Sequence, residues 1–136
     1  MQHRTEGLPI ERIIAALSYL TSGLIGFVWL ILGVILKLRV RPFLLYHIYQ
    51  SIFLSILFFI VSFALKLVLD ILSIIPLIGQ LISTVTFLLT ASIFGEYSII
   101  NIILLIIMLY LALTSLMGKY SYLPWVSNII KANLRI

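Results

Sequence analysis

Four long stretches without a charged residue make up most of this 136-residue chain. They are residues 13–36, 42–65, 71–95 and 97–118, and each is longer than the about 20 apolar residues with which a helix crosses a bilayer core. Hydrophobic residues make up 63% of the chain and charged residues 10%, whereas a soluble domain has about 45–50% and about 25%. We therefore predict an all-α, polytopic integral membrane protein and exclude a water-soluble globule.

The predicted organisation is a single membrane domain over residues 1–136. Pro76 and Gly79 interrupt the third apolar stretch, so this helix is expected to be kinked or partial. Four transmembrane helices are the preferred interpretation, and three helices plus a re-entrant or interfacial segment are the alternative. The expected segments are an N-terminal tail at 1–12, helices at 13–36, 43–65, 71–95 and 97–117, and an interfacial tail at 119–136.

Several residues mark the ends of these helices. Pro9 suits a first helical turn and Glu11 the positive end of the helix dipole, and Pro42 suits the start of the second helix. Gly118 followed by Lys119 is a typical helix stop. In the tail, apolar residues recur at helical spacing, which predicts an amphipathic interfacial helix. These residues are Trp125, Val126, Ile129, Ile130 and Leu134.

The net charge of +5 is concentrated at helix ends rather than spread along the chain. Cations beside membrane helices follow the positive-inside rule and contact anionic lipid headgroups. We therefore expect lipids, including anionic ones, as partners and no nucleic acid. The expected membrane-surface residues are Lys37, Arg39, Arg41, Lys119, Trp125, Lys131 and Arg135.

Counting cations does not distinguish four spans from three. Four spans place six cations on the side of the C-terminus and three on the other, the latter being Lys37, Arg39 and Arg41. Three spans again give six against three, with the minority now being Arg4, Arg12 and Lys66. Both arrangements place the C-terminus in the cytoplasm, or in the stroma of a plastid.

A line of small residues recurs every four positions in the first apolar stretch. Ser18, Ser22 and Gly26 would share one face of a continuous helix. Small residues in membrane helices allow close approach of a neighbouring helix. We therefore predict a packing seam here, and a ligand groove is the alternative.

No catalytic signature is present in the sequence. It has no cysteine, no glycine-rich phosphate loop, no HExxH helix and no nucleophile elbow. The two histidines lie 44 positions apart and the four acids are scattered, which argues against a metal site. The chain is therefore not expected to be an enzyme, and no catalytic residue, cofactor or metal is predicted.

Two polar pairs are the candidate polar path or partner contact. His47 and Gln50 lie three residues apart, so they share a helix face. A structural hydrogen bond between helices is their preferred role, and a polar path or partner contact is the alternative. Lys66 and Asp70 have the i, i+4 spacing that allows an ion pair. A simple pairing with Lys66 is the preferred role of Asp70, and as the one acid suited to coupled transport it is the alternative candidate for a transport site.

Three blocks resemble the twenty-kilodalton subunit family of the Tic translocon, the chloroplast inner-envelope import component, and its small bacterial relatives. The blocks are RIIAALSYL at 12–20, RPFLLYHIYQS at 41–51 and GKYSYLPWVS at 118–127. The family has a basic turn, an aromatic residue, an Asn or His and a Gln at the head of a membrane helix, and ends in Gly, a basic residue, Pro and Ser. The matching positions are Arg41, His47, Gln50, Gly118, Lys119, Pro124 and Ser127.

The resemblance implies a small helical membrane subunit in a larger complex for protein translocation or membrane-protein assembly. A single apolar stretch precedes the basic turn, where plastid members have more, so the chain looks closer to the bacterial relatives. We therefore expect the bacterial plasma membrane, or the thylakoid or plastid inner envelope in a photosynthetic source. A homo-oligomeric transporter of small solutes or ions, and a structural accessory subunit of a membrane enzyme complex, are the alternatives.

Overall fold

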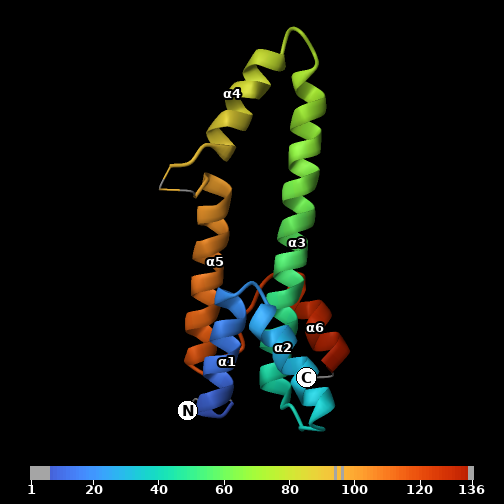
Figure 1. Ribbon diagram of the computed structural model, residues 1–136, viewed down its shortest axis with the longest axis vertical. Helices are drawn as coiled ribbons and strands as arrows, with labels where there is room; N and C mark the ends of the chain where they lie inside the picture. The colour runs from blue at the N-terminus through green and yellow to red at the C-terminus, as the bar shows by residue number, and fades with distance from the viewer. Residues whose placement is uncertain (1–6, 94, 96, 135–136) are drawn as a thin grey trace. The chain divides into compact units, whose positions relative to one another are not determined.

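The computed structural model describes residues 7–93, 95 and 97–134 (Figure 1). These residues form helices and no β-strand, which confirms the all-helical prediction. Arg135, the predicted N-terminal tail before Gly7, and residues 94 and 96 near the junction of the third and fourth predicted helices lie outside the described residues. The helices are α1 Pro9–Leu20, α2 Leu24–Ile35, α3 Pro42–Ser73, α4 Gly79–Thr90, α5 Ile99–Leu116 and α6 Val126–Leu134.

The chain divides into two compact units. Unit 1 consists of Met1–Ile56 together with Met108–Ile136, and unit 2 consists of Leu57–Ile107. Unit 1 contains α1, α2 and α6, the first part of α3 and the last part of α5, whereas unit 2 contains α4 and the rest of α3 and α5.

The first apolar stretch forms two short helices, so the prediction of one helix over 13–36 is wrong. After α1 the chain turns at Ser22 and Gly23, whose φ angles are +53° and +85°. The Ser22 and Gly23 amides donate to the Tyr19 and Ser18 carbonyls, which is the Schellman ending of a helix. With 12 residues each, α1 and α2 are about 18 Å long. They pack against each other, and neither is long enough to cross a bilayer alone.

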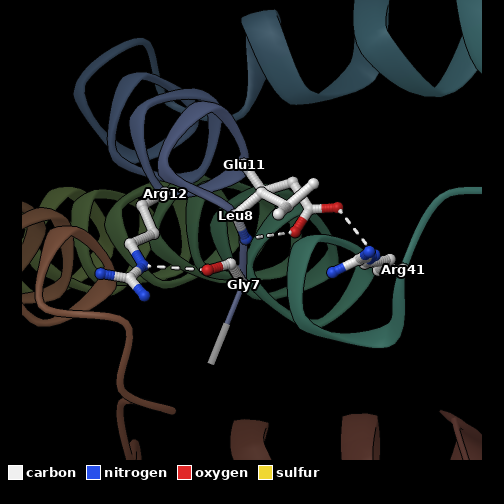
Figure 2. A network of polar contacts seen from close by, with 5 residues as sticks. All are labelled: Gly7, Leu8, Glu11, Arg12 and Arg41. Atoms are coloured by element: carbon white, nitrogen blue, oxygen red, sulfur yellow. Dashed lines mark hydrogen bonds and ion pairs between the residues drawn. The ribbon is translucent and has the colours of Figure 1, made fainter. Parts of the chain in front are cut away.

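An acidic cap fixes the start of α1 at Pro9, as predicted. The Glu11 carboxylate accepts a hydrogen bond of 2.7 Å from the Leu8 amide and lies 3.7 Å from the Arg41 guanidinium (Figure 2). On the other side, Arg12 Nε donates to the Gly7 carbonyl at 3.2 Å. The carboxylate therefore satisfies a free amide of the first turn and links α1 to the residue that precedes α3.

Helix α3 is longer than expected. It begins at Pro42, where the missing amide costs nothing, and continues through Lys66 and Asp70 to Ser73. The predicted interruption after it is confirmed, because the chain turns over 74–78 before α4 begins at Gly79. A Cβ at Gly79 would collide with the Ser73 carbonyl, so this turn requires glycine.

The predicted helix at 97–117 corresponds to α5. It ends in a second Schellman motif, in which Gly118 has a φ of +69° and Lys119 donates to the Thr114 carbonyl. The expected amphipathic helix of the tail is α6, and its apolar residues Val126 and Ile130 pack on Tyr46 of α3. This part of its apolar face is therefore covered by protein and is not free to lie in a membrane.

Two of the described helices, α3 and α5, are long and apolar enough to cross a membrane. Only 6% of the most apolar 18-residue window of α3 and 22% of that of α5 is buried. A core helix of a soluble protein would be mostly covered, so these helices have the exposure expected beside lipid. With 12 residues, α4 is about 18 Å long. Four membrane-crossing helices are therefore not confirmed.

Two of the three residues of the predicted small-residue seam, Ser18 and Gly26, lie close to each other, but on different helices. Ser18 is fully buried on α1, and a Cβ at Gly26 of α2 would lie 2.8 Å from its Oγ and 2.9 Å from Cγ2 of Ile48. The two residues therefore meet across the α1–α2 turn instead of sharing one helix face. Ser22 lies in that turn and is exposed, because the helix breaks there.

Replacing Gly26 with leucine should lower the stability of unit 1. The new side chain has no space between Ser18 and Ile48, and overpacking of this kind costs about 1–3 kcal/mol. Thermal unfolding followed by circular dichroism in mild detergent would measure the effect. Val34→Leu, at a 79% exposed position of the same helix, is the control and should leave the melting temperature unchanged. Equal melting temperatures for the two variants would contradict the seam.

Candidate functional site

The polar side chains of unit 1 converge in one buried network. The network contains one residue of α1, three of α3, one of the segment after α5 and one of α6. None of them is more than 3% exposed. They are Tyr19, Tyr46, His47, Gln50, Ser121 and Ser127.

Gln50 lies at the centre of this network. Its Oε1 accepts hydrogen bonds from the Tyr19 hydroxyl at 2.8 Å and the Ser121 hydroxyl at 3.0 Å. Its Nε2 donates to Ser127 Oγ at 3.2 Å and approaches the Ser121 carbonyl at 3.5 Å. The amide thus uses its donor and its acceptor ends to join α1, the segment after α5 and α6 to α3.

Tyr46 and Ser127 complete the attachment of α6. The Tyr46 hydroxyl lies 2.6 Å from the Ser121 carbonyl and 2.8 Å from Ser127 Oγ. Ser127 Oγ also accepts a hydrogen bond of 2.7 Å from the Leu123 amide. Ser127 Oγ also lies 3.4 Å from the Ser121 carbonyl, so the Tyr46 and Ser127 hydroxyls both have an acceptor and together hold α6 to α3.

The hydroxyl proton of Tyr19 indicates which tautomer of His47 fits the network. Its Nδ1 lies 2.8 Å from the Tyr19 hydroxyl, whose single proton goes to Gln50. Nδ1 therefore carries a proton and donates it to the Tyr19 hydroxyl. The ring is neutral, and Nε2 is unprotonated. No described residue gives Nε2 a hydrogen-bond partner.

Aromatic rings enclose His47. The ring centroids of Phe43 and Tyr46 lie 4.6 and 5.3 Å from that of the imidazole, both edge-on, and Tyr120 stacks on it at 6.1 Å. The imidazole is fully buried. Because no solvent reaches it, the arrangement is suited to structural attachment and not to proton transfer with an outside ligand.

The burial of His47 and Gln50 corrects one of their predicted roles. Both side chains are 0% exposed, so they neither line an open polar path nor contact a partner in this conformation. The preferred role, a hydrogen bond between helices, is the one that the geometry shows. Tyr19, Tyr46 and Ser121 were not predicted as members of the network, because no spacing pattern in the sequence joins residues 19, 46 and 121.

The residues that match the family motif have different places in unit 1. His47, Gln50 and Ser127 meet in the buried network, although Ser127 is 77 positions from Gln50. Gly118 supplies the left-handed turn that starts the segment leading to Ser121, and Pro124 lies within that segment before α6. Arg41 lies apart from the network, beside Glu11.

A cavity of about 400 Å³ lies in unit 2 between residues of α3, α4 and the start of α5. Lys66 and Asp70 line it together with Thr86, Ser98 and Asn101. The ion pair expected between Lys66 and Asp70 is absent from the described structure, although both side chains face the same space. Of the two predicted polar pairs, Lys66 and Asp70 at this cavity are therefore the pair that remains accessible.

The predicted membrane-surface residues in the described part of the chain are exposed. Lys37, Arg39, Lys119 and Lys131 all belong to unit 1 and have no ion pair with a described residue. Trp125 is 82% exposed, with a φ of +67°. Arg41 is 58% exposed on its side chain but is paired with Glu11.

The residues that the structure describes contain no group of three or more His, Cys, Asp or Glu side chains that could hold a metal ion. No family model, curated protein or solved structure matches the chain.

Replacing Gln50 with leucine should destabilise unit 1 by about 2 kcal/mol or more, because Tyr19, Ser121 and Ser127 would each lose a buried partner. The α6 segment should then exchange its amide hydrogens faster, as measured by hydrogen–deuterium exchange and mass spectrometry. Gln80→Leu, at an exposed position of α4, is the matched control and should change neither quantity. Unchanged protection of α6 in the Gln50 variant would contradict the attachment.

His47 should be neutral and carry its proton on Nδ1. Nitrogen-15 NMR of the labelled chain in detergent distinguishes the protonated from the bare ring nitrogen through two-bond couplings to the ring protons. The expected spectrum shows protonated Nδ1 and bare Nε2, because Tyr19 donates to Gln50. A proton on Nε2 would reverse the assigned direction of the Tyr19 hydrogen bond.

Proposed function

We propose that this protein is a small integral membrane subunit that works by packing against other membrane proteins. The observation that carries the proposal is the low burial of α3 and α5, two strongly apolar helices. An apolar surface of this extent must be covered by lipid or by another protein. Apart from His47 Nε2, the polar side-chain groups of the network in unit 1 are hydrogen-bonded within the chain, so they support a structural role rather than chemistry.

The cation distribution supports a topology in which only α3 and α5 cross the membrane. If α1 and α2 form a hairpin within one leaflet and α4 does not cross, both ends of the chain lie on the same side. Eight of the nine cations then share that side and Lys66 alone lies on the other. This is a stronger bias than the six against three of four spans, and the positive-inside rule places the shared side in the cytoplasm. The eight are Arg4, Arg12, Lys37, Arg39, Arg41, Lys119, Lys131 and Arg135.

Single-cysteine labelling can test this topology directly, since the chain has no cysteine of its own. Cysteines at the exposed positions Ile10, Leu38 and Tyr122 should react with a membrane-impermeant maleimide from the cytoplasmic side only. A cysteine at Leu77, which is 95% exposed, should react from the opposite side. Four spans would separate Leu38 from Tyr122, and three spans would separate Ile10 from both, so each alternative has its own labelling pattern.

The complex that this subunit joins is, in our proposal, one for protein translocation or membrane-protein assembly, in a bacterial plasma membrane or a plastid-type membrane. The resemblance to the Tic twenty-kilodalton family supports it. A further support is that His47, Gln50 and Ser127, which match the family pattern in separate blocks, meet in one network.

Photocrosslinking would test the membership in such a complex. Benzoylphenylalanine at Phe59 and Phe63, which are 71% and 61% exposed on α3, should give discrete adducts with an arrested membrane-protein chain or a translocation subunit. Benzoylphenylalanine at Phe43, which is 3% exposed, is the control and should give none. Adducts with lipid alone at both exposed positions would count against a translocation or assembly role.

A second candidate function is a homo-oligomeric transporter of small solutes or ions, and the cavity of unit 2 favours it. Asp70 and Lys66 line this cavity without pairing, so Asp70 is available to a solute. Asp70→Asn should then abolish flux in reconstituted vesicles, whereas Asn128→Asp on the exposed side of α6 should not. Flux that is the same in the Asp70 variant and the unmodified chain would exclude a coupling role for this carboxylate.

A further inference from the structure

We infer that the cavity of unit 2 binds a zwitterion, that is, one molecule carrying both an ammonium and an anionic oxygen group. Lys66 and Asp70 are one helical turn apart on α3 and both line the cavity. They are the two charged side chains that the structure describes in this unit. A cation and an anion that face one space offer complementary charges to the two ends of a zwitterion.

The two side chains are free for such a ligand, because no ion pair of the described structure includes either of them. A lysine that precedes an aspartate by four residues has the weaker of the two orientations for pairing along a helix. Little competing attraction therefore has to be broken when an ammonium approaches Asp70 and an anionic group approaches Lys66.

Neutral polar groups complete the lining. The Thr86 and Thr90 hydroxyls donate to the Ile82 and Thr86 carbonyls, so their oxygen lone pairs remain available to an ammonium. Asn101 lies at the start of α5, and its side-chain amide makes no hydrogen bond within the described residues. Its NH₂ group, near the positive end of the α5 dipole, can donate to an anionic oxygen.

The size and depth of the cavity limit the ligand. A volume of about 400 Å³ is typical of a site for a small molecule or a lipid headgroup. Lys66 is 24 residues beyond Pro42, or about 36 Å along the helix axis, which exceeds the about 30 Å of a bilayer core. This step rests on the proposed crossing of α3, which places the cavity at the level of the lipid headgroups. A phosphatidylethanolamine headgroup and a free amino acid are the two sources of a zwitterion there.

Native mass spectrometry of the full chain in mild detergent would test the inference with two added lipids. Phosphatidylethanolamine should be retained in preference to phosphatidylglycerol, and Lys66→Gln and Asp70→Asn should each reduce its retention at least fivefold. The double swap K66D/D70K should restore retention, because a zwitterion can bind in the reverse orientation. Gln80→Ala, at an exposed position of α4 that does not line the cavity, is the control and should have no effect.

Calorimetric titration with alanine distinguishes a free zwitterion from a lipid. Saturable heat that both single variants abolish, without specific lipid retention, would support the inference with a free amino acid as the ligand. Binding of either probe that does not depend on both Lys66 and Asp70 would overturn it, as would equal retention of the two lipids without such heat. Carbonate extraction separates this inference from the proposed membrane placement. A chain that stays in the membrane but binds neither probe contradicts this inference alone. A chain that is released from the membrane contradicts the membrane placement.

Discussion

The arrangement of unit 1 depends on the hydrogen bonds of the Gln50 side chain. It accepts from Tyr19 of α1 and from Ser121, and it donates to Ser127 of α6. In apolar surroundings a polar group without a partner costs about 1–3 kcal/mol, so each of these groups is held where another can satisfy it. These hydrogen bonds, together with the packing of Val126 and Ile130 on Tyr46, hold the C-terminal segment on α3.

The helix breaks follow from local backbone chemistry. At Ser22 and Gly118 the chain adopts positive φ, and the next amides return to carbonyls of the helix that has just ended. The turn at Gly118 starts the segment that reaches the network, whereas the turn at Ser22 reverses the chain and brings α2 back onto α1. A serine at positive φ carries a steric cost that glycine avoids, so the Ser22 turn is the more strained of the two. The Ser22 turn divides the first apolar stretch into two 12-residue helices that are too short to cross a membrane alone.

The two units handle their polar residues differently. Unit 1 encloses the six polar side chains of the network and leaves Lys37, Arg39, Lys119 and Lys131 exposed, whereas the charged side chains described in unit 2, Lys66 and Asp70, line its cavity. Because a charge is costly at the bilayer centre, the position of these two residues near the far end of α3 is the one that a membrane helix tolerates. The buried network that attaches the helices and the cavity that is open to a ligand therefore belong to different units.

The sequence alone determined the helical class, the starts at Pro9 and Pro42, the stop at Gly118 and the break near Pro76, because composition and local backbone preferences act over a few residues. It did not predict the break at Ser22, since an uncharged apolar stretch has the same composition whether it is one helix or two. Nor did it predict that residues 19, 50, 121 and 127 meet. Only the tertiary structure decided this, because hydrogen bonds between distant segments depend on how the helices pack and leave no spacing pattern in the chain.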